Sequence, residues 1–231
     1  MNEVITHNIR QIDYTSSVTL FIICALALLA FIKYNFGKSI LYEIQSLFNY
    51  RQALRTYDER RESDRQSDIL TGILFTLIAG IFVSTALSFF GASPLWQSHT
   101  LTILFFTLII GAIYVIKALI WNILGIIFMA QAFSKIYIYN MFLFNRITGL
   151  IILPFVAIIP YIASIIKPYL IFSVIFIFIL SYLLKLWRII QIIHAQNVSI
   201  IYFILYLCAL EILPLLILIK ACMLLNINIF V

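Results

Sequence analysis

Charged side chains are scarce in this sequence. They make up 10% of the 231 residues, whereas 64% of the residues are hydrophobic. A soluble domain carries roughly 25% charged and 45–50% apolar residues. The difference excludes an ordinary soluble protein and predicts an all-α, polytopic membrane helix bundle that forms one domain over residues 1–231. The Lys and Arg residues stand mostly at the ends of apolar runs, so we expect the lipid bilayer as a partner and no nucleic acid.

Cysteine and glycine are also sparse. The three cysteines, Cys24, Cys208 and Cys222, lie in apolar runs without a close pair, which indicates neither a disulfide framework nor a metal site. The seven glycines give no support for a GxxxG interface. None of the motifs G-x-S-x-G, H-E-x-x-H, G-x-G-x-x-G or the P-loop is present. We therefore expect no metal and no cofactor, and favour a non-enzymatic role over catalysis.

Six apolar runs are predicted to cross a bilayer, since about 20 helical residues span a hydrocarbon core of about 30 Å; the first is short and is expected to extend to Tyr34. They cover residues 17–31, 69–90, 100–128, 149–166, 170–187 and 200–220. The third run is longer than one crossing needs, which predicts a tilted or extended helix. Lys117 lies inside this run, and it either snorkels to the interface or lies deeper and faces Glu211.

The long hydrophilic segment 37–68 separates the first two spans. Its first half places Ile40, Leu41, Ile44, Leu47 and Phe48 on one helical face, which predicts an amphipathic helix in the membrane interface. Its second half mixes basic and acidic residues, and forms either a soluble tether or a docking surface for a partner protein. At its end, Ser67 and Asp68 are suitable N-caps for the second span.

A second amphipathic stretch, residues 129–148, precedes the fourth span. Most of its polar residues cluster on one side of a helical wheel, and Asn140 falls opposite; the clustered residues are Gln131, Ser134, Lys135, Asn145 and Arg146. The stretch is either an interfacial helix between spans or a polar wall that lines a cavity. Inside the fourth span, Pro154 and Pro160 predict helix kinks.

Glu211 stands near the middle of the sixth run, and Pro214, a further predicted kink, follows it. A lone carboxylate in hydrocarbon costs on the order of a few kcal/mol, so it needs a partner. The candidate cations are Lys117 and Arg146. The amides of a nearby candidate polar cluster are Asn122, Asn140 and Asn145. Such a set either holds the helices in one arrangement or forms a site that carries protons or binds an anionic headgroup.

Basic residues indicate how the chain is oriented. Eleven lie in the connections on one side of six spans and three on the other. Because cytoplasmic connections are enriched in Lys and Arg, segment 37–68 is predicted to be cytoplasmic and both termini periplasmic.

Residues 132–155 and 207–221 resemble an uncharacterised multi-pass membrane family of the Bacteroidota, known only as a domain of unknown function. The resemblance extends over most of the chain from the second span onward. Its most specific parts are the stretch from Asn140 to Arg146 and the stretch from Glu211 to Pro214. It implies a location in the inner membrane of a diderm bacterium, and it implies no activity.

Two hypotheses of function come from these features. The first is a non-enzymatic subunit or accessory factor of an inner-membrane complex, in envelope assembly, with a protein partner or a second copy of itself. The second is a small transporter or proton-coupled carrier that uses Glu211. A third, a lipid-modifying enzyme with a basic cytoplasmic rim, has less support because no catalytic residues are recognisable.

Overall fold

Long helices make up nearly all of the structure, which is a computed structural model. It describes residues 14–36, 62–90, 98–127, 131–163 and 165–196, and the single residue Lys220. The helices are the N-terminal helix Tyr14–Phe36, α3 (Glu62–Phe89), α4 (His99–Ile127), α5 (Gln131–Ile158), the 3₁₀ turn η2 (Ile159–Tyr161) and α6 (Lys167–Gln196). In these ranges no strand occurs, so the all-α prediction is confirmed.

Five of the helices are long and apolar enough to cross a membrane, which makes this a multi-pass membrane protein. The sixth predicted span, residues 200–220, lies outside the described residues, and with it Glu211 and Pro214. The predicted amphipathic helix at residues 40–48 also lies outside them.

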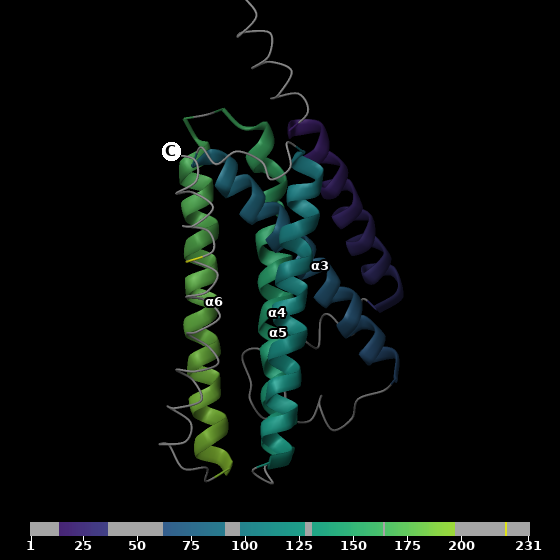
Figure 1. Cartoon of the computed structure of the whole chain (residues 1–231), viewed down its shortest axis with the longest axis vertical. Coiled ribbons are helices and arrows are strands. Elements are labelled where there is room, and N and C mark those ends of the chain that lie inside the picture. The colour runs from purple at the N-terminus through teal and green to yellow at the C-terminus, as the bar shows by residue number, and fades with distance from the viewer. Residues whose placement is uncertain are drawn as a thin grey trace, which may run out of the picture.

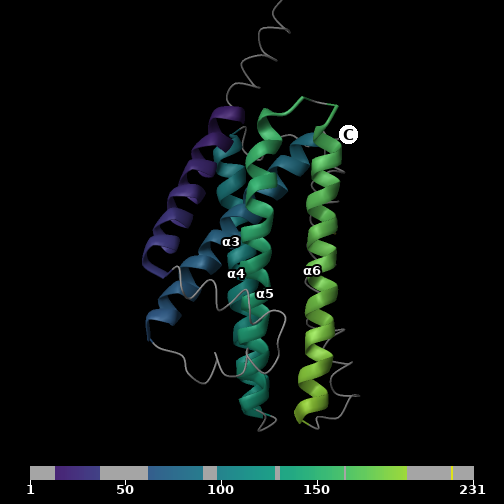
Figure 2. The same ribbon diagram turned by 180° about the vertical axis from the view of Figure 1, so that it is seen from behind.

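The helices run up and down in alternation (Figures 1 and 2). The N-terminal helix lies on one side of the bundle and α6 on the other, with α4 and α5 between them, while α3 crosses the bundle obliquely from the side of the N-terminal helix toward the side of α6. In the span windows of α3 and α5, 56% of the residues are buried, against 11% in α4 and 17% in α6. The centre of the bundle is therefore α3 packed on α5, while α4 and α6 present broad apolar surfaces to the surroundings.

The third span is one unbroken helix, as expected. α4 has 29 residues, which at 1.5 Å per residue gives a length of about 43 Å. This exceeds a hydrocarbon core of about 30 Å, so α4 either tilts or projects beyond the core. The same holds for α5 and α6, with 28 and 30 residues.

Close contacts between helices occur at single glycines. A Cβ at Gly80 of α3 would lie 2.9 Å from the backbone N of Thr107 in α4. A Cβ at Gly149 of α5 would lie 3.2 Å from Cα of Phe75 in α3. The contacts use isolated glycines rather than a GxxxG repeat, and they bring the backbones of α3, α4 and α5 together in the middle of the bundle.

A separate set of contacts joins the last part of α4 to the first part of α5. Ser134 Oγ donates a hydrogen bond to the carbonyl oxygen of Trp121 at 2.8 Å, and both residues are buried. The Trp121 and Tyr137 rings lie 3.9 Å apart, centroid to centroid. These contacts fix the hairpin at the end of the bundle where α4 ends.

Two expectations are corrected here. Ser67 and Asp68 are not N-caps, because α3 already begins at Glu62 and both residues lie inside it. The boundary drawn at Thr148 between an interfacial helix and the fourth span does not exist, because α5 continues through it. Polar residues did not end the helix, since their side chains are accommodated by neighbouring helices.

Candidate functional site

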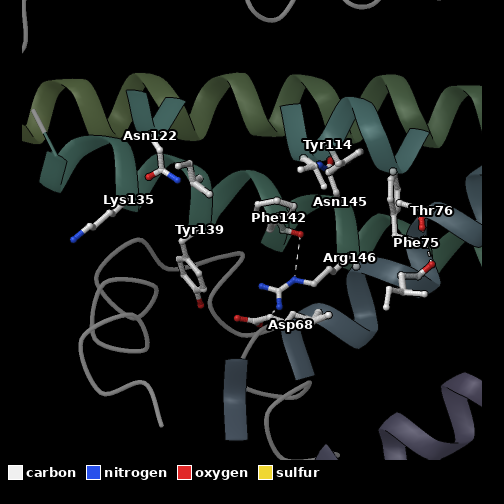
Figure 3. A pocket seen from close by; sticks show the side chains of 16 residues that line it. Asp68, Phe75, Thr76, Tyr114, Asn122, Lys135, Tyr139, Phe142, Asn145 and Arg146 are labelled. Atoms are coloured by element: carbon white, nitrogen blue, oxygen red, sulfur yellow. Dashed lines mark hydrogen bonds and ion pairs between the residues drawn. The ribbon is translucent and has the colours of Figure 1, made fainter. Parts of the chain in front are cut away.

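A buried ion pair joins the two central helices. Arg146 of α5 and Asp68 of α3 face one another and form a salt bridge (Figure 3). The Arg146 side chain is 1% exposed and that of Asp68 16%. Arg146 Nε also donates a hydrogen bond to the carbonyl oxygen of Phe142 at 3.2 Å. Because a lone charge in a membrane protein interior is costly, each member of this pair stabilises the burial of the other.

The pair lies at the wall of a cavity of about 640 Å³ between α3, α4 and α5. Lys135 and Asn122 lie at one end of it, Thr76 and Phe75 at the other, and the Asp68–Arg146 pair between them (Figure 3).

The direction of α3 explains why the cavity is there. At Gly80, α3 touches the α4 backbone, whereas a Cβ at Gly72, about two turns earlier, would meet no atom within 4 Å. The first part of α3 therefore diverges from α4 and α5 (Figure 1). The long Arg146 side chain reaches across part of this gap, and the remainder is the cavity.

A second hollow, of about 460 Å³, lies between α4 and α6. Lys117 and Lys185 are among its lining residues. Phe75, Tyr114 and Asn145 line both hollows, so these three side chains form the partition between them.

The contact between α5 and α6 contains further buried polar groups. Arg188 Nε donates a hydrogen bond to Oδ1 of Asn140 at 3.4 Å, and Asn140 Nδ2 donates one to the carbonyl oxygen of Ile136 at 2.8 Å. Lys185, one turn before Arg188, is also buried. Thr148 and Ser181 share a short hydroxyl–hydroxyl hydrogen bond. α6 is thus attached to α5 through polar as well as apolar contacts.

The structure separates the residues that the sequence grouped. Asn122, Asn145 and Arg146 line the first cavity together, whereas Asn140 faces α6. Lys117 lines the second hollow. The pairing of Glu211 with either cation stays a prediction, because Glu211 lies outside the described residues.

The prolines occupy different positions. Pro154 lies inside α5, and Pro160 lies in η2, where α5 gives way to a 3₁₀ turn.

Sequence reasoning missed the central acid of the site. Asp68 was interpreted as a cap because it directly precedes an apolar run. The available signal was the position of Arg146 within an otherwise apolar stretch, since a buried Arg requires an acidic or carbonyl partner. Among residues whose side chains the structure describes, Asp68 is the only acid, so it is the natural partner for Arg146.

This arrangement suits binding and helix positioning. The guanidinium of Arg146 is permanently charged and is occupied by Asp68 and by the Phe142 carbonyl. In the described ranges, no group of three His, Cys, Asp or Glu residues could hold a metal ion. The cavity combines one solvated cation, Lys135, with amides and a long apolar wall.

A family model described as "Domain of unknown function (DUF4271)" matches residues 18–222. No curated protein and no solved structure matches the chain.

Proposed function

The chain belongs to the DUF4271 family, a family of unknown function, and we propose that it is a non-enzymatic subunit or accessory factor of an inner-membrane complex. The observation that carries this proposal is the Asp68–Arg146 pair. The guanidinium of Arg146 is engaged with Asp68 and holds α3 on α5, so it serves a structural role rather than a catalytic one. Envelope assembly is the process in which we would test the role first.

The broad apolar surfaces of α4 and α6 support the same proposal. Both helices run the length of the bundle, and few of their residues are buried. In a membrane, such surfaces contact lipid or a neighbouring membrane protein, and a partner subunit or a second copy of this chain suits them.

The experiment is an affinity purification from native membranes in mild detergent after gentle crosslinking. Wild type is compared with Asp68→Asn, with Glu211→Gln and with the control Lys33→Gln, which changes an exposed lysine. We expect one reproducible set of partners for wild type and control, and loss of that set in Asp68→Asn, in which α3 is released from α5. Loss of the set in Glu211→Gln would make Glu211 an assembly residue. A monodisperse wild-type protein that copurifies with nothing would contradict the proposal.

The orientation is part of the proposal. Lys33, Lys135 and Arg188 lie on helix segments toward the same end of the bundle, whereas Lys167 lies at the other end (Figure 1). The enrichment in basic residues favours a cytoplasmic location for the first end, and six spans then place both termini in the periplasm. Attachment of a reporter enzyme at either terminus, active only in the periplasm, tests this orientation.

A small proton-coupled carrier is the second candidate. It is favoured by the position of Asp68, a partly exposed carboxylate beside a large cavity. Reconstituted protein should then move protons or a solute across liposomes, and Asp68→Asn should abolish the flux. Liposomes containing wild type that are as tight as empty ones would refute this candidate.

A further inference from the structure

We propose that the cavity between α3, α4 and α5 binds an anionic phospholipid from the adjacent membrane leaflet, with its phosphate near Lys135 and an acyl chain along the apolar wall. The proposal goes beyond the proposed function and stands independently of it. Its four supports are the access to the cavity, its polarity, its charge and the backbone positions that keep it open.

The cavity is accessible from the side of the bundle. Ile73 of α3 and Val115 of α4 line it, and both are about half exposed. Because these residues belong to membrane-spanning helices, their exposed surface faces the lipid phase. A lipid can therefore enter laterally, without crossing the bundle.

Most of the described lining beyond Lys135 and Asn122 is apolar, and its polar exceptions are Asn145, Thr76 and the Asp68–Arg146 pair. Lys135 lies near the start of α5, and Asn122 near the end of α4, at the same end of the bundle. Gly111 lies eleven residues before Asn122 in α4, which at 1.5 Å per residue is about 16 Å deeper. Apolar side chains line most of the interval; they are Ile73, Val115, Ile138 and Phe142. A lipid head near Lys135 and an acyl chain along the apolar side chains match this lining.

The charge of the lining determines which phospholipid headgroup it suits. Asp68 compensates Arg146, so the described lining retains one positive charge, that of Lys135. Asn122, next to this lysine in the view of Figure 3, adds an amide that donates hydrogen bonds. One cation together with an amide donor suits a phosphodiester with one negative charge better than a zwitterionic head.

Two glycines keep the cavity open. A Cβ at Gly72 or at Gly111 would meet no atom within 4 Å, and both residues line the cavity. In contrast, a Cβ at Gly80 or Gly149 would press on a neighbouring backbone. A space of about 640 Å³ falls in the range of roughly 300–1,000 Å³ that is typical of ligand sites. The first carbon of a side chain at either glycine would meet open space, so a larger side chain there would project into the cavity.

Native mass spectrometry tests the proposal. Delipidated full-length protein is titrated with phosphatidylglycerol or with phosphatidylcholine of the same chains, and retained lipid is counted. For wild type we expect one tightly retained phosphatidylglycerol, preferred at least tenfold over phosphatidylcholine. Gly111→Leu should reduce its occupancy at least tenfold. Lys135→Gln should remove the preference while leaving weaker binding of both lipids.

Two controls match these variants. Ala112→Leu adds the same bulk to the neighbouring, exposed position of α4, and Lys167→Gln removes a lysine from the opposite end of the bundle. Both should bind as wild type does. If Gly111→Leu does not give folded protein, Gly72→Leu tests the same volume from α3. Equal retention of the two lipids by wild type, or an unchanged occupancy in the folded leucine variant, would overturn the proposal. Displacement of the lipid by millimolar inorganic phosphate would also overturn it, because the site would then recognise a free anion.

Discussion

Replacement of Asp68 by Asn removes one charge from the buried pair without changing the shape of the side chain. Arg146, with 1% of its side chain exposed, keeps its bond to Phe142 but loses its anionic partner. Breaking a buried ion pair in this way costs about 3–5 kcal/mol. Because Asp68 is partly exposed at the cavity wall, we expect the lower end, about 3 kcal/mol.

A double variant separates the charge effect from the packing effect. Asp68→Asn combined with Arg146→Met leaves no buried charge at the site. Replacing both members of a buried pair is often nearly neutral, so the double variant should lie within about 1 kcal/mol of wild type. It should therefore be more stable than Asp68→Asn alone by about 2 kcal/mol, and this difference contains the coupling between the two residues.

The assay is reversible unfolding in mixed micelles of increasing denaturing-detergent content, followed by circular dichroism of the helices. Lys33→Gln serves as the control, and its free energy of unfolding should equal that of wild type because Lys33 is exposed. If the double variant were no more stable than Asp68→Asn, the uncompensated charge of Arg146 would not be what destabilises the single variant. The proposal that the Asp68–Arg146 pair holds α3 on α5 would then be wrong.

Two further predictions concern packing and depth. Gly72→Ala should be neutral or stabilise α3 by up to about 1 kcal/mol, because its Cβ meets open space. Gly80→Ala should destabilise the protein by roughly 1–3 kcal/mol, because its Cβ meets the backbone of Thr107. The same unfolding assay measures both free energies of unfolding. Lys185 lies eleven residues before the end of α6, and Glu211 eleven residues after the start of the sixth predicted span, so a helical sixth span would bring them to one depth. Lys185→Glu and Glu211→Lys should each lower the yield of monodisperse protein, and the combined exchange should restore it. A yield that stays low in the combined variant would show that the two residues do not form a pair.

The membrane class and most helix positions could be predicted from the sequence because they depend on local properties. The length and apolarity of a run determine whether it can cross a bilayer, and five of the predicted runs correspond to helices in the structure, although α5 ends at Ile158 within the fourth run. Family membership was also predicted, and residues 18–222 confirm it. The Bacteroidota origin stays a prediction.

The ends of the helices could not be predicted in the same way. Hydropathy marks where a chain becomes polar, but a polar residue continues a helix when another helix satisfies its side chain. Asp68 and Arg146 illustrate this, since each lies at a boundary drawn from hydropathy and each lies inside a continuous helix. Their pairing depends on how α3 crosses α5, and no short-range pattern encodes that crossing.

Two glycines of α3 also show that packing between helices could not be predicted from the sequence. Gly72 and Gly80 lie on one helix and are chemically identical, yet one borders open space and the other a backbone. The difference arises because two straight helices that cross at an angle approach closely only near the crossing point. Away from that point, the gap must be bridged by long side chains or occupied by another molecule. This chain bridges part of the gap with Arg146 and leaves the rest bordered by glycine, so the ion pair and the cavity are two consequences of a single helix crossing.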